Sequence, residues 1–335
     1  MTNLRLELPA PMRGRLPVLD ELKGLAIILV VLYHAGGVLV WGNKLHGDVG
    51  VDIFVILSGV GLMLGSAAQD AGQFFLRRFK RIFPTYWVVL TAYVVANTHF
   101  LELHYSPTDL VLHFLGIHAW FGDAYGMSIN DSFWFITLIV TLYLLYWILR
   151  PLLCAPDKLL LWGGTICMVP TLIFFYMGQA GVFGHLALRL PGFFLGLLLG
   201  RLMRDGRLDL PLTATMAGAL LLFLYVPYTQ GIIFGSVPIG FTLILAYAFL
   251  LRARVSEGFR RTLKYLGDHS LEIFLIHQPL IRQYNFYLHG RWFNIPSPSD
   301  GSLTIGIAIG LVVTLFLSAE LHRLMARFYR RTGTS

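Results

Sequence analysis

The chain has 335 residues, of which 56% are hydrophobic and only 13% are charged, and its mean hydropathy is +0.68. An ordinary soluble domain carries about 25% charged residues, so this composition excludes a soluble globular protein and indicates a polytopic membrane protein. The net charge of +8 is compatible with binding to nucleic acid, but the positions of the basic residues fit membrane topology instead.

Apolar windows along the chain predict the transmembrane helices. A spanning helix needs about 20 mostly apolar residues, and the sequence predicts an all-α fold with about ten of them. Their approximate bounds are 18–41, 49–67, 83–101, 132–150, 159–178, 185–203, 211–229, 232–251, 265–287 and 303–326. The apolar stretch at 108–122 is too short to cross, and we predict an extracytoplasmic interfacial or re-entrant helix there.

The distribution of basic residues gives the orientation. With a cytoplasmic N-terminus, most of the 26 Lys and Arg residues fall in cytoplasmic segments, as the positive-inside rule requires. We therefore expect both termini in the cytoplasm, and a multi-pass protein of the inner (plasma) membrane of a bacterium. The chain is expected to form a single membrane domain over 1–335, with cytoplasmic tails at 1–17 and 327–335.

The first predicted span contains two ionisable side chains, Lys23 and His34. They are eleven residues apart, about three helical turns, so they share one face and are separated by roughly 16 Å along the axis. Ionisable residues inside a span are costly and mark functional sites. His34 is therefore the candidate catalytic residue, and Lys23 a candidate supporting residue on the cytoplasmic side.

The second predicted span places Asp52 near the level of His34. A carboxylate there would hold the second imidazole nitrogen and raise its basicity; alternatively, Asp52 is a hydrated residue at the helix end. Ser58 is a further supporting candidate in the same helix. The segment LSGVGLMLG of this helix contains Gly59, Gly61 and Gly65. We expect them mainly to allow close helix packing.

Two later spans contain further candidates. His277 falls near the centre of the ninth span, close to the level of His34, and is either a hydrogen-bonding residue facing the bundle or part of the site. Glu272 lies about 140° round the same helix, so we expect one of the two to serve only helix packing. Arg189, in the sixth span, would neutralise an anionic group, pair with Asp52 or reach the outer headgroups.

A basic run precedes the third span. Arg77, Arg78 and Arg81 are spaced to form a compact cationic face at the cytoplasmic surface, just before Pro84. Guanidinium groups bind phosphate with two parallel hydrogen bonds, so this face suits a polyanion such as the phosphates of coenzyme A. The alternative is that these arginines only set the topology.

Taken in order, these residues resemble the acyltransferase 3 family of integral membrane acyltransferases over almost the whole chain. The family's first helix has a basic residue, ten intervening residues and a His, after an Asp-containing lead; here these are Asp20, Lys23, Gly24 and His34. The other matching motifs are at 50–59, 77–87, Trp134, Arg189 and 270–279.

The sequence departs from the family pattern in one motif. Many members carry an acidic pair after the Trp of the fourth span, where this chain has Ile139 and Val140. Many members also append a periplasmic hydrolase-like domain, and we expect this chain to be a stand-alone member. Such members modify hydroxyls of polysaccharides or oligosaccharides.

The resemblance implies transfer of an acyl group, most often acetyl, from cytoplasmic acyl-CoA to a hydroxyl of a lipid-linked or exported glycan. His34 would act as general base or carry the acyl group, and Asp52 would orient it. Acyl-CoA, the glycan and membrane lipids are the expected partners, with no nucleic acid, no metal and no permanently bound cofactor. The alternatives are a transporter or flippase, and an acyltransferase with a small-molecule acceptor.

Overall fold

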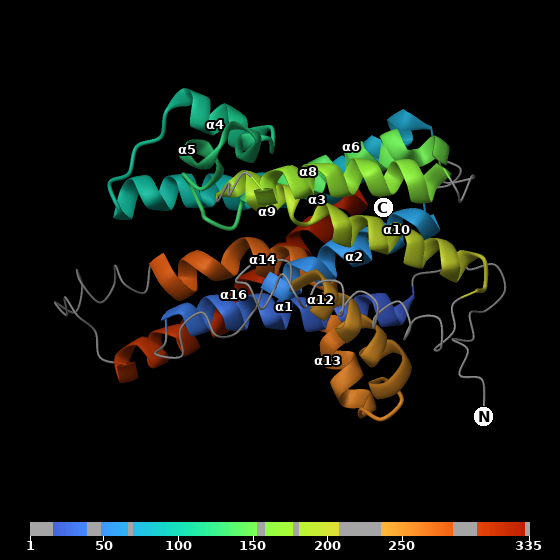
Figure 1. Cartoon of the computed structure of the whole chain (residues 1–335). Coiled ribbons are helices and arrows are strands. Elements are labelled where there is room, and N and C mark those ends of the chain that lie inside the picture. Colours follow the sequence, from blue (N-terminus) through green and yellow to red (C-terminus); the bar gives the residue numbers. More distant parts are fainter. Residues whose placement is uncertain are drawn as a thin grey trace. The chain divides into compact units, whose positions relative to one another are not determined.

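A computed structural model of the chain describes residues 16–38, 48–65, 70–152, 158–176, 181–207, 236–283 and 300–331 (Figure 1). These residues form helices and turns without a strand, so the all-α prediction is confirmed. They fall into two compact units. One unit is formed by Met1–Leu29, Asp48–Gln69 and Leu142–Asp268, and the other by Val30–Gly47, Asp70–Thr141 and His269–Ser335. The single domain over 1–335 stays a prediction.

Within the described ranges, three helical segments are both long and apolar enough to cross a membrane. They are Trp134–Leu152, Val182–Arg204 and Thr304–Arg330. Shorter apolar helices occur at Val49–Gly65, Leu161–Ile173, Val237–Leu251 and Ser270–Ile281. The predicted span at 211–229 lies outside the described residues. The total of about ten spans and the cytoplasmic termini therefore stay predictions.

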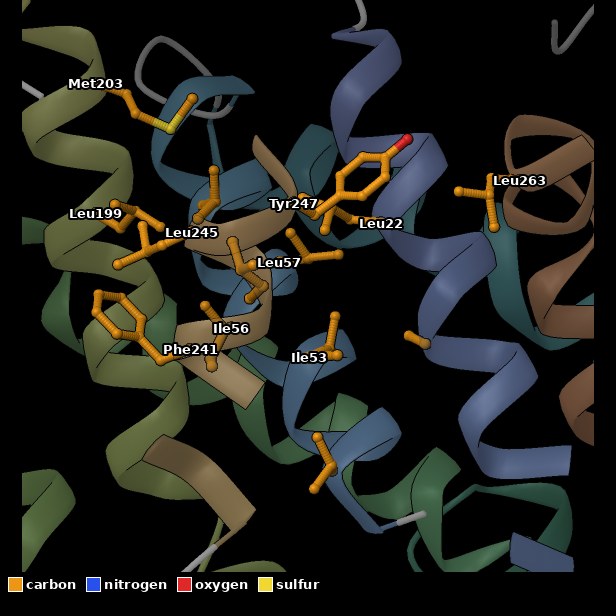
Figure 2. Packing of buried hydrophobic residues seen from close by; sticks show 14 residues of the cluster. Leu22, Ile53, Ile56, Leu57, Leu199, Met203, Phe241, Leu245, Tyr247 and Leu263 are labelled. Carbon is orange, nitrogen blue, oxygen red and sulfur yellow. The ribbon is translucent and has the colours of Figure 1, made fainter. Parts of the chain in front are cut away.

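The first unit contains the first part of α1 (Pro17–Val38) and further helices from later in the chain. These are α2 (Asp48–Gly65), the end of α6 (Trp134–Leu149), α8 (Gly164–Tyr176), α9 (Val182–Ala187), α10 (Leu190–Arg204), α12 (Ser236–Leu245) and α13 (Glu257–Asp268). Its core surrounds α2. Figure 2 shows this cluster, with Ile56 of α2 among Leu199 of α10 and Phe241 and Leu245 of α12.

Helices α2 and α10 lie side by side because glycines remove the side chains between them (Figure 1). A β-carbon built on Gly59 would lie 2.6 Å from the Phe193 carbonyl oxygen, and one on Gly196 would lie 2.1 Å from that of Ile56. A β-carbon on Gly61 or Gly65 would meet nothing within 4 Å. Of Gly59, Gly61 and Gly65, only Gly59 has the close-packing role that the sequence predicted.

Helix α13 corrects the predicted start of the ninth span. The sequence placed that start at residue 265, but α13 ends at Asp268 and α14 begins separately at Ser270. Helix α13 buries only a narrow stripe, which includes Leu263 and Gly267, and is strongly amphipathic. A β-carbon on Gly267 would lie 1.8 Å from the Asp20 carbonyl oxygen, so α13 packs directly against the start of α1.

The second unit contains the end of α1 and further helices from the middle and the end of the chain. These are α3 (Ala71–Phe100), α4 (Pro107–Phe114), a 3-10 turn at His118–Phe121, α5 (Asp123–Gly126), the start of α6, α14 (Ser270–Gln278) with a π-helical extension at Pro279–Gln283, and α16 (Asp300–Arg331). The segment predicted at 108–122 thus forms two short helices. Helix α16 continues through residues 327–331 of the expected C-terminal tail.

Helix α3 is longer than the predicted span at 83–101. It begins after Asp70, whose side chain accepts a hydrogen bond of 2.9 Å from the Gln73 amide, and it continues through Pro84. Pro84 has no N–H to donate to the Lys80 carbonyl one turn earlier. The Tyr329 hydroxyl of α16 donates to that carbonyl instead. The proline therefore interrupts one hydrogen bond without ending the helix.

Two histidines form a buried pair in the short helices after α3. The rings of His113 and His118 are stacked, with centroids 3.9 Å apart and planes 7° from parallel, and both are fully buried. Burial, with the neighbouring His113 as a second cause, lowers the pKa of His118 to about 3. Burial also lowers the pKa of His113. Both rings are therefore neutral near pH 7.

The contact between α2 and α10 predicts opposite effects for two similar substitutions. Gly59→Ala would push a methyl group into the α10 backbone, so we expect the free energy of unfolding to fall by about 1–3 kcal/mol. Gly61→Ala faces open space and gains helix propensity, so stability should be unchanged or rise by up to about 1 kcal/mol. Thermal unfolding of both purified variants in detergent measures this, and equal effects would contradict the assigned packing.

The buried histidine pair predicts a loss of stability in acid. An unfolded imidazole takes up a proton below about pH 6.5, whereas His118 in the folded chain does so only near pH 3. The unfolded chain therefore binds more protons between these values, and stability falls as the pH falls, by about 3 kcal/mol at pH 4. His118→Phe should flatten the dependence of the melting temperature on pH, whereas His99→Phe, at an exposed site, should leave it unchanged.

Candidate functional site

The structure brings together two of the predicted site residues, His34 and His277. His34 Nδ1 lies 3.0 Å from His277 Nε2, and the ring planes meet edge to face at 66°. His277 is fully buried and His34 is half-buried. Both belong to the second unit, His34 on the end of α1 and His277 on α14. His34 belongs to the first predicted span and His277 to the ninth.

Backbone carbonyls fix which nitrogen of each ring carries the proton. His277 Nδ1 lies 3.1 Å from the Ile273 oxygen and 2.9 Å from the Phe274 oxygen, so Nδ1 must be the donor. In the neutral ring, Nε2 of His277 is then an acceptor, and His34 Nδ1–H donates to it and to the Val30 oxygen 3.0 Å away. The lone pair of neutral His34 is therefore on Nε2. This is the nitrogen that would serve as a base.

Polar contacts on both sides hold α14 at the level of His277. The Tyr93 hydroxyl of α3 donates to the Ile276 carbonyl at 2.8 Å. The Gln278 side chain donates to Asp131 at 3.2 Å and accepts from the Ser132 hydroxyl at 3.2 Å. The sequence alone does not predict these positioning residues. The one available signal was Gln278, which directly follows the histidine in a family motif.

Glu272 faces a different partner from His277. Its carboxylate lies 2.9 Å from His322 Nδ1 of α16, and the His322 ring packs against His269 with centroids 4.4 Å apart. This contact joins α14 to α16 at Glu272, about one and a half helical turns before His277. Glu272 and His277 thus contact different side chains, and the expectation that one of them serves only helix packing stays a prediction.

Asp52 and Arg189 form a buried ion pair in the first unit. Arg189 Nε lies 3.8 Å from Asp52 Oδ1, and both residues are buried. Of the roles expected for Arg189, pairing with Asp52 is thus present. The proposed contact between Asp52 and His34 joins residues of different units and stays a prediction. Ser58 donates to the Phe54 carbonyl of its own helix at 2.8 Å, and its supporting role also stays a prediction.

The start of α1 is held by charged side chains. Lys23 Nζ lies 3.0 Å from Asp20 Oδ1. Glu21, which follows Asp20, accepts two hydrogen bonds from Arg252, at 2.7 and 3.0 Å, and one from the Tyr247 hydroxyl at 2.9 Å. A carboxylate buried among three donors is well compensated for its loss of water. A contact of Lys23 with the acyl donor stays a prediction.

The three arginines predicted to bind acyl-CoA lie on the first turns of α3. Arg77 and Arg81 are exposed, whereas the Arg78 guanidinium lies over the Phe74 ring, 4.8 Å from its centroid. The cation–π contact orients Arg78 along the helix surface. The helix places the three side chains at i, i+1 and i+4, as expected, and phosphate binding by them stays a prediction.

The chain is similar to proteins whose names describe the transfer of acyl groups. The chain is 30% identical over 130 residues to the peptidoglycan O-acetyltransferase OatA of Listeria monocytogenes. The aligned region covers 36% of this chain and 20% of that protein. It is 36% identical over 98 residues to a protein of Komagataeibacter xylinus with the provisional name membrane-bound transacylase BcsY, covering 28% of this chain and 24% of that protein.

The match to the curated relatives is partial, whereas the match to a family model is nearly complete. The chain spans less than two fifths of each relative that it matches. No solved structure matches it significantly. The family model described as the acyltransferase domain of acyltransferase 3 proteins matches residues 16–322, which include every candidate site residue. The resemblance found in the motifs is thereby confirmed, and the chain belongs to the acyltransferase 3 family.

Proposed function

We propose that this protein is a membrane O-acyltransferase that moves an acyl group, most simply acetyl, from acyl-CoA to a hydroxyl of a cell-surface or exported glycan. The contact between His34 and His277 carries the proposal, because it supplies an oriented imidazole with a defined basic nitrogen. Membership of the acyltransferase family and the O-acetyltransferase name of one relative support the reaction type. That relative's name, with peptidoglycan in it, also supports a glycan acceptor.

In the first mechanism, His34 is a general base. Its Nε2 takes the proton of the acceptor hydroxyl while that oxygen attacks the thioester carbonyl, and the tetrahedral intermediate then expels the thiolate of CoA. The thiolate receives the proton from His34, so the imidazole is restored. His277 stabilises the imidazolium formed in between, because its Nε2 lone pair accepts from His34 Nδ1–H. General base catalysis of this kind contributes about 10²–10⁴ to a rate.

In the second mechanism, His34 is a nucleophile. Nε2 attacks the thioester carbonyl and CoA leaves as the thiolate, so an acyl-imidazolium remains on His34. The acceptor hydroxyl then attacks the acyl carbon, the bond to Nε2 breaks, and the proton lost from the hydroxyl balances the charge of the CoA thiolate. The same tautomer serves both mechanisms, since each needs the lone pair on Nε2. Trapping of an acyl-enzyme with radiolabelled acetyl-CoA in the absence of acceptor separates them.

The donor site is proposed at the start of α3. Arg77 and Arg81 are exposed there, and planar guanidinium groups bind phosphates with directed hydrogen bonds. Lys23 would contact the phosphates or the pantetheine arm. A transporter or flippase is the competing function, and it predicts no transfer of acyl groups in a sealed vesicle that contains the protein, acetyl-CoA and a glycan acceptor.

Substitution of the two histidines separates catalysis from positioning. His34→Ala should abolish transfer of labelled acetyl from acetyl-CoA to glycan in proteoliposomes, because no base remains. His277→Phe removes the acceptor for His34 Nδ1–H and should lower kcat by about 10–100-fold, whereas KM for acetyl-CoA stays nearly constant. His277→Gln retains an acceptor oxygen and should recover part of the loss.

Two measurements keep this test interpretable. Gel filtration and thermal unfolding of each variant show whether it is correctly folded in detergent. His99→Ala, which changes an exposed histidine at the end of α3, is the matched control and should keep full activity. Full activity of a folded His34→Ala variant would exclude His34 as the catalytic residue.

The arginines of α3 predict a change in donor affinity. Arg78→Ala or Arg81→Ala should raise KM for acetyl-CoA about tenfold, because one charge-assisted contact with phosphate is worth about 1.5–3 kcal/mol. The value of kcat should change little. Arg261→Ala, at an exposed position of α13, is the control. An unchanged KM in the α3 variants would leave these arginines as topology signals.

A further inference from the structure

An apolar groove of about 560 Å³ runs along the second unit between α3, α14 and α16. Its walls include Val88, Ala92 and Ala96 of α3, Leu280 just after α14, and Leu317 and Leu324 of α16. Val88, Leu317 and Leu324 are exposed by 42%, 41% and 52%, so the groove is open along its side. Two small alanines on α3 create the space, because they stand opposite the larger side chains of α16.

The charged residues of the groove all come from the last turns of α16. Glu320, Arg323 and Arg327 line it together with the apolar walls. Arg323 is paired with Glu320. Arg327 is exposed, and no carboxylate in the described part of the chain lies within ion-pair distance of it. The groove therefore has one net positive charge, which Arg327 contributes.

A single hydrogen bond shows which end of α3 meets this charge. The Tyr329 hydroxyl of α16 donates to the Lys80 carbonyl of α3, whereas Tyr93 and Ala96 line the groove further along α3 with Leu317 and Leu321. The two helices therefore run in opposite directions. The basic end of α16 lies beside the basic start of α3, which contains Arg81. The groove is cationic at that end and apolar at the other.

We propose that this groove binds a membrane phospholipid with an anionic headgroup. One acyl chain would lie along Val88, Ala92 and Ala96, and the phosphate would contact Arg327. Helix α16 is long and apolar enough to cross a membrane over Thr304–Arg330, so hydrocarbon chains are the molecules that surround its exposed face. Basic pockets between membrane helices bind anionic headgroups, and each nearby Arg contributes about fivefold in affinity.

The charge and the shape of the groove favour this occupant over acyl-CoA. The groove has a single net positive charge, that of Arg327, because Arg323 is paired with Glu320. One positive charge suits the single phosphate of a glycerolipid better than the several phosphates of CoA. The open side also suits a lipid, which enters from the bilayer. The lipid would support Ile276, which lines the groove next to the buried His277.

Lipid titration of the intact protein tests the site. We would titrate the detergent-purified protein with phosphatidylglycerol or phosphatidylcholine and count bound lipids by native mass spectrometry. Phosphatidylglycerol should bind at least fivefold more tightly. Arg327→Gln should weaken its binding about fivefold and abolish the preference, whereas Arg330→Gln, three residues further along an exposed face of α16, should have no effect.

Substitutions that fill the groove test whether it binds the acyl chain of the lipid. Ala92→Phe should reduce binding of both lipids by at least tenfold, and Val95→Phe, at an exposed site of α3 outside the groove, is its control. Leu317→Trp serves the same purpose if Ala92→Phe does not fold. Equal binding of the two lipids, or unchanged binding in a folded groove-filling variant, would overturn the proposal. Displacement of phosphatidylglycerol by acetyl-CoA would also overturn it, because the groove would then be a donor site.

Discussion

The hydrogen bond between His34 and His277 is the interaction on which the candidate site depends. It joins α1 to α14 inside the second unit, and both rings have their Nδ1 directed at carbonyl oxygens of their own helices. Because a carbonyl accepts and never donates, neither ring can reverse its tautomer without losing a hydrogen bond. The helix backbones thus determine the protonation pattern of the pair, and the pattern places a basic nitrogen at the far side of His34.

Close backbone contacts at glycines and directed hydrogen bonds both hold the helices of the two units. In the first unit, glycines let backbones touch, as at Gly59 and Gly196, so the helix positions are set by shape. In the second unit, side chains donate to backbone carbonyls or to one another, as Tyr93 does to Ile276 and Tyr329 does to Lys80. Hydrogen bonds of this type are directional, and they fix the rotation of α14 about its own axis as well as its distance from α3.

Periodicity and depth in the sequence predicted much of the architecture and part of the site. The apolar windows predicted the three described segments that are long and apolar enough to cross a membrane. Helical geometry indicated that Glu272 and His277 face different ways, and they contact different partners. The predicted span begins at residue 83, next to Pro84, whereas α3 continues through that proline. The sequence does not indicate this continuity, because the compensating hydroxyl of Tyr329 comes from the other end of the chain. The contacts of Gln278 with Asp131 and Ser132 also join segments that are distant in the sequence. Pairings between distant segments leave no periodic signal.

The choice of a histidine as the partner of His34 follows from burial. A carboxylate as deeply buried as His277 would need a compensating charge, because desolvation of an isolated ion is very costly. Asp52 illustrates this requirement, since it is fully buried with Arg189 3.8 Å away. The positive charge of a facing guanidinium offsets the field of a carboxylate, so the carboxylate raises the basicity of a third group only a little. A neutral imidazole has no such cost, and it still accepts the proton of His34 Nδ1. The fully buried His277 is therefore the better orienting residue for a base that must act at the edge of an apolar interior.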